Sequence, residues 1–306
     1  MLTMLAAVAA ASSSPITAPG PDGQLAGSFI DAGKSAPVVV IIPGSGPTDR
    51  DGNNPMGITA QPYKLLADAL AAKGISSVRI DKRGLFGSKA AIADPNAVTI
   101  AAYAADAHAW ARVVRQATKA KCVWLAGHSE GSLVALAAGQ DSTDLCGIIS
   151  ISGMGRPFGT VLRDQLRANP ANAPLLDPAL NAIDTLESGQ AVDAAQLPAP
   201  LQALFRPAVQ PYLMDLMKYR PAALAGSLKL PLLIIQGDRD LQVGVDDARA
   251  LAMANPQAKL VIAPDMNHVL KVIKSDNRAA NLATYGDSSL PVDPTAVEAV
   301  AAFVKR

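Results

Sequence analysis

Short apolar runs alternate with helix-like segments along most of this 306-residue chain. Residues 36–44 (APVVVIIPG) form a continuous apolar run rich in branched side chains, and residues 62–74 and 98–117 have the pattern of helices. A strand that is apolar along its whole length has to be buried on both faces, as in parallel sheets covered by helices on each side. The alternation therefore predicts an α/β protein with a doubly wound, mostly parallel sheet.

One region interrupts this alternation. Residues 156–226 contain no strand-like run but several helical pieces and nine prolines. We therefore expect residues 23–155 and 227–306 to form the α/β core, and residues 156–226 to form a helical cap inserted into it. The strand-like runs of the core are residues 23–33, 36–44, 75–80, 122–127, 147–152, 230–238 and 258–265.

The first residues, MLTMLAAVAAASSS, are apolar and then small, with Ala-x-Ala at Ala7–Ala9 and Ala9–Ala11. This pattern is typical of the end of a secretory signal, although no Lys or Arg precedes Lys34. We expect residues 1–22 to be an N-terminal extension that carries a signal peptide or its remnant. An ordinary alanine-rich extension is the alternative. A signal would place the protein in the periplasm or outside the cell, and the alternative would place it in the cytoplasm.

Composition excludes several classes of partner. The formal net charge is +1 and aromatic residues make up 4% of the chain, so we expect no nucleic-acid partner. The two cysteines, Cys122 and Cys146, have no second Cys or His at ligand spacing, and no metal site is expected. The apolar N-terminal run is too short for a stable membrane span.

The pattern Gly-x-Ser-x-Gly occurs at residues 127–131, where a strand-like run gives way to a helical segment rich in alanine and leucine. A serine at such a sharp turn has a strained backbone, and the flanking glycines remove side chains that would collide with it. The hydroxyl of Ser129 would then lie above the sheet at a helix N-terminus, where amide groups can stabilise an oxyanion. Ser129 is therefore the predicted nucleophile.

A serine hydroxyl needs a general base, and the chain contains three histidines. His128 adjoins Ser129, where consecutive side chains diverge, and His108 lies within a predicted helix. We expect His128 to pack beside the turn, and His108 to be structural or exposed. His268 lies in a polar loop, PDMNHVL, directly after the last predicted strand, at the sheet edge where α/β sites form. His268 is the predicted base.

The base in turn needs an orienting carboxylate. The segment LLIIQGDRDLQV provides Asp238 and Asp240 after the preceding strand. Asp240 lies deeper in the loop and is the predicted partner, whereas Asp238 is expected to cap the turn. Asp265, three residues before His268, is a second alternative and is expected to shape that loop. The order Ser129, Asp240, His268 is the order expected on an α/β-hydrolase sheet.

Two backbone amides are expected to hold the oxyanion. One belongs to Glu130, which follows the nucleophile. The other is expected from residues 43–54 (PGSGPTDRDGNN), in which Gly44 and Gly46 allow a tight turn beside the substrate. Ser45 is the predicted donor, with Gly46 as the alternative.

Together these segments resemble the serine α/β-hydrolases, in particular the bacterial esterases grouped with serine-aminopeptidase-like and monoglyceride-lipase-like hydrolases. The resemblance rests on PGSGPTDRDGN, RIDKRGLFGS, GHSEGS, RPAVQPYL, QGDRDLQV and MNHVL. The family often has His-Gly before the oxyanion loop, where this chain has Pro43-Gly44. The resemblance implies an α/β-hydrolase fold with an inserted cap. It also implies hydrolysis of short- to medium-chain carboxylic esters, as small-molecule substrates, through an acyl-enzyme and without a metal or organic cofactor.

The cap is expected to contribute to the acyl site. Tyr212, Met214 and Met217, in PYLMDLM, are the candidate substrate contacts, because adaptable methionine side chains suit varied acyl groups. Packing of the helix against the core is the alternative for each of them.

Other functions stay open at this point. A peptidase that removes N-terminal residues would need an anionic group for the substrate ammonium, and the cap offers Asp177, Glu187 and Asp215 without an obvious cluster. A thioesterase is chemically close. A catalytically silent binding module is the alternative from a different class.

The two cysteines begin strand-like runs that are direct neighbours in sheets of this family. Equivalent positions on adjacent strands lie about 5 Å apart, within the range that a disulfide tolerates. A bridge between Cys122 and Cys146 is therefore one expectation, favoured in an oxidising compartment. Free buried thiols are the alternative.

Overall fold

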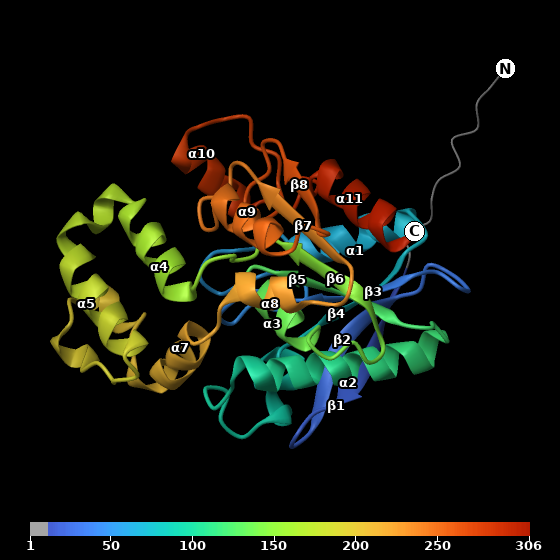
Figure 1. Ribbon diagram of the computed structural model, residues 1–306, viewed down its shortest axis with the longest axis horizontal. Coiled ribbons are helices and arrows are strands. Elements are labelled where there is room, and N and C mark those ends of the chain that lie inside the picture. The colour runs from blue at the N-terminus through green and yellow to red at the C-terminus, as the bar shows by residue number, and fades with distance from the viewer. Residues whose placement is uncertain (1–11) are drawn as a thin grey trace.

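The computed structural model describes residues 12–306, and its strands form one twisted sheet with helices on both faces (Figure 1). Residues 1–11, which include most of the predicted signal segment, lie outside the described residues. The eight strands follow the order β1-β2-β4-β3-β5-β6-β7-β8. Their bounds are β1 Ser13–Pro19, β2 Gln24–Ile30, β3 Val38–Ile42, β4 Ser76–Ile80, β5 Val123–His128, β6 Leu145–Ile151, β7 Leu232–Gly237 and β8 Lys259–Ala263.

The pairing of the strands is parallel from β4 to β8, and only β1 and β2 run antiparallel to their neighbours. The prediction of a doubly wound, mostly parallel sheet is therefore confirmed. The first strand is a correction to the sequence analysis, which assigned residues 1–22 to an extension. Ser13–Pro19 instead pair along their whole length with β2, so the sheet begins within that segment.

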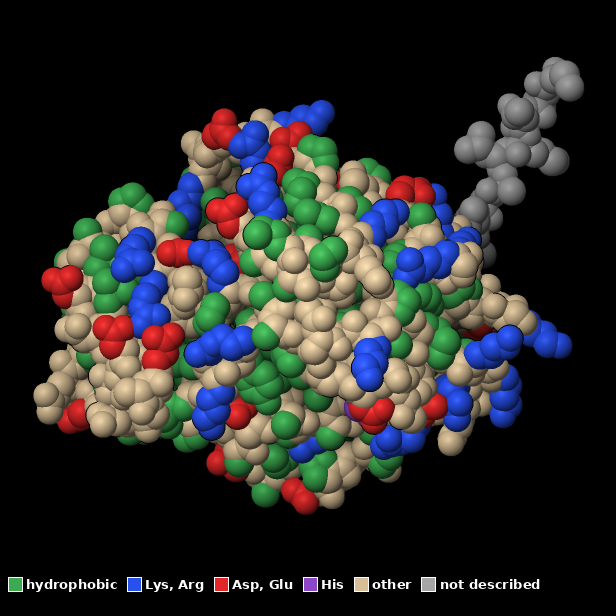
Figure 2. All heavy atoms as spheres, viewed as in Figure 1, with side chains coloured by type: hydrophobic (Ala, Val, Ile, Leu, Met, Phe, Trp, Pro, Cys, Tyr) green, Lys and Arg blue, Asp and Glu red, His purple; other side chains and the backbone are tan. Residues whose placement is uncertain are grey.

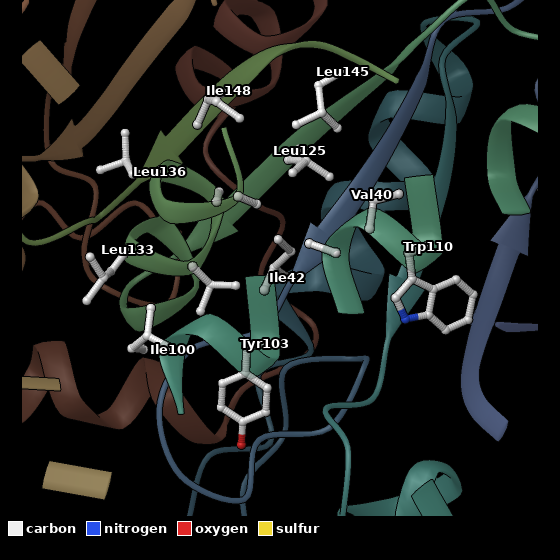
Figure 3. Packing of buried hydrophobic residues seen from close by; sticks show 14 of the residues in the cluster. Val40, Ile42, Ile100, Tyr103, Trp110, Leu125, Leu133, Leu136, Leu145 and Ile148 are labelled. Carbon is white, nitrogen blue, oxygen red and sulfur yellow. The ribbon is translucent and has the colours of Figure 1, made fainter. Parts of the chain in front are cut away.

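Alternate residues of the central strands divide the core into two layers. Val38, Val40 and Ile42 of β3 pack on one face with Trp110, and Val39 and Ile41 pack on the other face. Helices α2, α3, α8 and α9 cover the first face, and α1 and α11 cover the second. Figure 3 shows Val40, Ile42 and Trp110 in the first of these layers. This burial on both faces explains why β3 is apolar at every position.

The bounds of the helices are α1 Pro62–Ala72, α2 Ile100–Thr118, α3 Glu130–Ala138, α4 Phe158–Arg167, α5 Leu176–Glu187, α6 Ala199–Gln202, α7 Gln210–Met217, α8 Pro221–Ser227, α9 Val245–Ala254, α10 Arg278–Ala283 and α11 Pro294–Val304. Short 3₁₀ segments lie at η1 Phe86–Ala91, η2 Pro170–Leu175, η3 Ala194–Gln196, η4 Pro207–Val209 and η5 Thr284–Gly286.

Among the helices of residues 12–306, none has the length and apolarity that a membrane crossing requires.

The segment between β6 and β7 contains helices and loops but no strand, and α4, α5 and α7 project to one side of the sheet (Figure 1). These helices enclose a small hydrophobic cluster of their own, whose buried members include Leu162, Ile183 and Phe205. The last helix of the predicted cap is different. Ala225 of α8 lies in the main core, so α8 acts as the crossover helix between the two strands rather than as part of the projecting cap.

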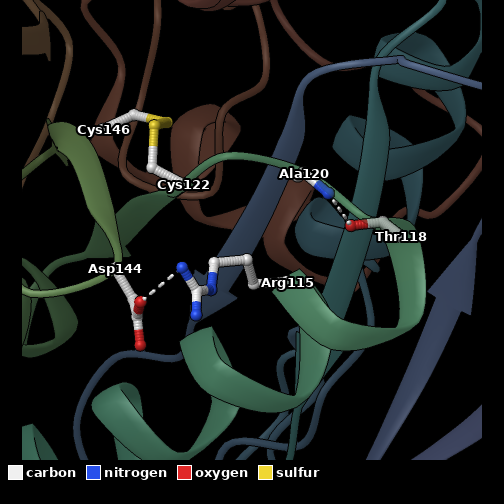
Figure 4. The surroundings of a disulfide bond; sticks show 6 residues. All are labelled: Arg115, Thr118, Ala120, Cys122, Asp144 and Cys146. Atoms are coloured by element: carbon white, nitrogen blue, oxygen red, sulfur yellow. Dashed lines mark hydrogen bonds and ion pairs between the residues drawn. A yellow bond between two sulfur atoms is a disulfide. The ribbon is translucent and has the colours of Figure 1, made fainter.

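Cys122 and Cys146 form a disulfide with a Cα–Cα distance of 5.1 Å (Figure 4). Cys122 directly precedes β5, and Cys146 lies in β6 at an irregularity where the register shifts by one residue. Cys146 is the extra residue between the pairs Val123–Leu145 and Trp124–Gly147, so it lies close to Cys122 near the start of both strands. The expected bridge is therefore present.

The surface carries intermixed charges. On the face shown in Figure 2, basic and acidic side chains alternate over both the core and the cap, without an extended patch of one sign. This distribution agrees with the formal net charge of +1.

Candidate active site

Ser129 lies at the junction of β5 and α3, with a backbone conformation (φ 54°, ψ −121°) that residues other than glycine rarely adopt. The neighbouring glycines make this turn possible. A Cβ atom on Gly127 would collide with the backbone of Gly131, and one on Gly131 would collide with the carbonyl oxygens of Ile42 and Pro43. Close backbone packing on both sides therefore imposes the turn, as the Gly-x-Ser-x-Gly pattern predicts.

The side chain of Ser129 is not used to stabilise the fold. The residue is partly accessible, and its hydroxyl does not cap α3. Its amide donates to the carbonyl of Ile151 at 2.9 Å, which holds the turn against the neighbouring strand β6. The hydroxyl is thus presented at the N-terminus of α3, where the helix dipole favours negative charge.

His268 and Asp240 are hydrogen-bonded, with 2.8 Å between Nδ1 of the imidazole and Oδ2 of the carboxylate. Both side chains are buried. The other carboxylate oxygen of Asp240 accepts from the amides of Gln242 (2.8 Å) and Val243 (2.9 Å). Burial raises the pKa of Asp240, but the nearby charge of His268 and these hydrogen bonds outweigh it, so the net pKa is below its usual value. The carboxylate is therefore ionised and fixed in orientation.

The two alternative carboxylates lie elsewhere. Asp238 is exposed, and its Oδ1 accepts from the amide of Asp265 at 2.7 Å, so it ties the β7 loop to the β8 loop. Asp265 has a left-handed backbone (φ 59°) and faces Arg239 across 3.5 Å. Both residues shape the loops around His268 without touching its ring.

The other histidines are occupied by structural hydrogen bonds. Nδ1 of His128 contacts the hydroxyl of Tyr63 at 2.8 Å, and its Nε2 contacts the carbonyl of His268 at 2.8 Å. Burial, together with the neighbouring His268, lowers the pKa of His128 to about 3. His108 contacts the carbonyl of Ala138 from α2. Neither ring has a carboxylate partner in the described part of the chain.

The contact through His128 brings the loop of His268 to the serine turn. The rings of His128 and His268 lie 4.7 Å apart between centroids. No hydrogen bond links the Ser129 hydroxyl to His268 within residues 12–306. In enzymes without substrate such bonds are often long and tighten only in the complex.

The loop after β3 packs directly on the serine turn. A Cβ atom on Gly44 would lie 3.2 Å from Cβ of Ser129, so only glycine allows this approach without displacement. The amide of Gly44 donates to Tyr63 at 3.1 Å and is therefore not available to a substrate. The amides of Ser45 and Glu130 make no hydrogen bond to other described residues. Gly46 has a left-handed φ of 66°, which a glycine accommodates without strain.

Sequence analysis did not identify two residues at this site. Tyr63 of α1 bridges Gly44 and His128, and no local pattern connects positions so far apart in the chain. Lys82 follows β4 and contacts both the carbonyl of Gly44 and the carboxylate of Glu130. A lysine two residues after a wholly buried strand is the signal that could have indicated its role.

The predicted cap contacts divide between two surfaces of α7. Tyr212 packs toward the main core, with its ring edge-to-face on Tyr103 at 6.1 Å. Met217 is buried in the hydrophobic cluster of the cap, and Met214 packs against the same cluster while staying partly accessible. Burial in the cap cluster favours the packing alternative for Met217. Tyr212 and Met214 keep some accessible surface.

Within residues 12–306, no three His, Cys, Asp or Glu side chains are arranged to hold a metal ion. The polar groups at the site are instead a serine, an imidazole–carboxylate pair and free amides. Such a set can supply a nucleophile, a proton acceptor and oxyanion donors without a cofactor.

Comparisons with known proteins identify the family. Residues 56–272 match the family described as serine aminopeptidase, S33. The chain is 29% identical to the esterase EstD of Thermotoga maritima over 241 residues, which are 76% of this chain and 54% of that protein. The chain thus spans about half the length of this curated relative.

Solved structures share the fold at low sequence identity. The Pyrococcus furiosus esterase Pf2001 superposes with a TM-score of 0.58 and 18% identity, over 97% of this chain and 93% of that chain. A puromycin-hydrolyzing peptidase of Mycobacterium tuberculosis gives a TM-score of 0.60 and 18% identity, over 99% of this chain and 40% of that chain. Because the family match covers most of the chain and the fold agrees, the protein belongs to the serine aminopeptidase S33 family of α/β-hydrolases.

Proposed function

We propose that the protein is a serine carboxylesterase that hydrolyses short- to medium-chain esters through an acyl-enzyme. The observation that carries this proposal is the buried Asp240–His268 pair beside a strained, uncapped serine. This combination is the arrangement that activates a hydroxyl for attack on a carbonyl. The names of two relatives, the esterase EstD and the esterase Pf2001, support the same chemistry.

In this mechanism Ser129 attacks the ester carbonyl while His268 accepts its proton. Nδ1 of His268 is engaged by Asp240, so Nε2 is the nitrogen that takes the proton. Asp240 fixes the tautomer and stabilises the imidazolium that forms. The amides of Ser45 and Glu130 hold the oxyanion, and His268 then protonates the leaving alcohol. Water then attacks the acyl-enzyme while His268 accepts a proton from it, and His268 returns this proton to Ser129 as the acid is released.

The surroundings of the cap carboxylates favour an esterase over an N-terminal peptidase. Such a peptidase needs a free anionic group for the substrate ammonium. Glu187 is instead paired with Arg163, and Asp215 accepts from the amide of Ile100 at the start of α2. Asp177 is exposed in the first turn of α5.

Tyr212 and Met214 of α7 are proposed as contacts of the acyl chain, and Gly44 and Gly46 as backbone contacts beside the reacting carbonyl. Tyr212 and Met214 are the candidate cap residues that retain accessible surface. A flexible thioether and a tyrosine ring can adapt to acyl groups of different length.

We also propose that the protein works in an oxidising compartment, periplasmic or extracellular. The Cys122–Cys146 disulfide supports this proposal, because disulfides persist mainly outside the reducing cytosol.

A direct assay tests the proposed function. Nitrophenyl esters of graded acyl length would be compared with an aminoacyl anilide and a thioester, using the native protein and its Ser129→Ala variant. We expect hydrolysis of the shorter esters and stoichiometric labelling of Ser129 by a fluorophosphonate. Preferred cleavage of the anilide, or ester hydrolysis that survives in Ser129→Ala, would contradict the proposal.

A further inference from the structure

The peptide group between Gly44 and Ser45 is held at its carbonyl oxygen by a buried lysine. Nζ of Lys82 donates to the carbonyl oxygen of Gly44 at 2.6 Å, and lies 3.3 Å from Oε1 of Glu130. We propose that Lys82 is a positioning residue for the oxyanion hole, which sets the direction of the Ser45 amide and couples it to Glu130. This inference rests on the proposed function.

The burial of this pair requires a specific reason. Lys82 is 5% exposed and Glu130 is 3% exposed. A buried ion pair costs desolvation energy and is a weak source of stability, because apolar side chains of similar size often do as well. The ammonium also lies 5.5 Å from the centre of the Tyr103 ring, which adds a favourable contact. The shorter of its two polar contacts is to the backbone of Gly44, not to the carboxylate.

That contact fixes the orientation of one proposed oxyanion donor. The carbonyl of Gly44 and the amide of Ser45 belong to a single planar peptide group, and the chain has no cis peptide bonds in its described part. In a trans peptide the C=O and N–H bonds point in opposite directions. A lysine that binds the oxygen from one side therefore aims the Ser45 N–H to the other side. The positive charge also polarises the peptide and strengthens that donor.

The second contact connects the other proposed donor. Glu130 supplies its own amide at the start of α3, and its carboxylate pairs with Lys82. One ammonium group thus links the β3 loop to the first residue of the helix that follows Ser129. Donors that are fixed before substrate binds do not have to reorganise during the reaction.

The opposite end of Gly44 is held by a separate chain of hydrogen bonds. Its amide donates to the hydroxyl of Tyr63 at 3.1 Å, so the Tyr63 proton is directed to Nδ1 of His128. Nε2 of His128 then carries a proton and donates to the carbonyl of His268. Both polar groups of Gly44 are therefore engaged, whereas the amides of Ser45 and Gly46 make no hydrogen bond to other described residues.

The adjacent residue provides a matched control. Arg83 has a side chain that is only 11% exposed, pairs with the carboxylate of Asp106 at 2.6 Å, and donates to the carbonyl of Ala102 at 3.0 Å. It therefore makes the same two kinds of contact as Lys82, but to α2 instead of the oxyanion loop. The Arg83 variant therefore shows what the loss of a paired, nearly buried cation does to the fold when the oxyanion loop is left unchanged.

The experiment compares Lys82→Met, Arg83→Met and the double variant Lys82→Met/Glu130→Gln. For Lys82→Met we expect kcat to fall by about 10- to 100-fold with KM changed by no more than about 2-fold, because an oxyanion contact acts in the transition state. Affinity for a trifluoromethyl ketone, which forms a tetrahedral adduct with the serine, should weaken in proportion to kcat/KM. Arg83→Met should lower the unfolding temperature but keep kcat and the inhibitor affinity close to native.

The double variant separates positioning from charge balance. It leaves no lone buried carboxylate, so it should fold even where Lys82→Met does not. We expect its kcat to stay as low as that of the single variant, because Gly44 still lacks its donor. A folded Lys82 variant with native kcat and inhibitor affinity, or recovery of kcat in the double variant, would overturn the inference. Failure of the proposed function is distinguishable, since the native protein itself would then neither hydrolyse esters nor be labelled at Ser129.

Discussion

The carboxylate of Asp240 and the imidazole of His268 meet at 2.8 Å, with the Asp240 side chain fully withdrawn from solvent. Two loop amides and Gln236 also donate to this carboxylate. The loop after β7 is therefore folded around the carboxylate, which holds the ring of His268 from the adjacent strand. This relationship leads to the first prediction.

Asp240→Asn should reduce kcat/KM by about 10³- to 10⁴-fold, because the amide favours the wrong imidazole tautomer and cannot stabilise its charge. Asp238→Asn is the matched control, since the Asp238 carboxylate accepts from the Asp265 amide and makes no hydrogen bond to His268. We expect the control to retain activity to within a few-fold. Steady-state kinetics on one nitrophenyl ester measures both variants. Equal losses, or the opposite ranking, would move the assignment to Asp238.

Ser129→Ala should retain the fold and lose about 10⁴-fold or more in turnover, because the members of a catalytic triad act as a unit. Its unfolding temperature should be at or above that of the native protein, since alanine removes no structural hydrogen bond of the side chain. Circular dichroism melting and esterase assays check the two parts. Near-native turnover would rule out the proposed mechanism.

The lowered pKa of His128 predicts that the folded protein loses stability in acid. This pKa is about 3 in the folded protein, well below the ordinary value of 6.5, because burial disfavours the charged ring. Between these values the unfolded chain binds a proton that the folded protein does not, so stability falls as the pH falls from about 6.5 toward 3. Urea unfolding at a series of pH values measures this slope. In His128→Asn the slope should become shallower, and identical slopes would contradict the prediction.

Substitutions in α7 should separate the acyl site from helix packing. Met214→Ala and Tyr212→Ala are expected to shift the preferred acyl length, whereas Met217→Ala should mainly destabilise the cap cluster, by about 2–5 kcal/mol if the cavity does not collapse. A panel of esters and a chemical-denaturation curve measure the two effects. An unchanged length preference in the first two variants would reject the acyl-site role of the helix.

The disulfide predicts that a denatured, unreduced sample contains no free thiol. Replacing both Cys122 and Cys146 by serine should lower the free energy of unfolding by about 3 kcal/mol, because the bridge closes a loop in the unfolded chain. Ellman titration and denaturant unfolding provide the measurements. Two titratable thiols per chain would remove the support for an oxidising compartment as well.

Local patterns in the sequence were sufficient to predict the elements whose residues are all buried. β3 and β7 are buried at every position and were recognisable as apolar runs. β1 was missed because Ser13–Pro19 form an exposed edge strand with two prolines, in which no apolar run marks the pairing. The assignment of α8 to the cap was wrong for a similar reason, since its composition does not indicate which layer it packs against.

The residues of the site also differ in how well the sequence predicts them. The turn at Ser129 and the loops of Asp240 and His268 carry their signals in adjacent residues, and could be predicted. The contacts of Tyr63 and Lys82 join segments 19 to 65 residues apart in the chain. Such contacts depend on the register of β3, β4 and β5, which no single segment specifies.

The position of α8 has a consequence for how this protein can diversify. Because α8 completes the β6–β7 crossover by itself, helices α4 to α7 form an excursion that leaves the sheet order and register unaffected. Insertions, deletions or replacements in that excursion would change the acyl site that we propose at Tyr212 and Met214, while Ser129, Asp240 and His268 stay in place. Substrate range and catalytic chemistry then depend on different stretches of the chain. Mutations in the excursion could therefore change the range of substrates without changing the catalytic residues.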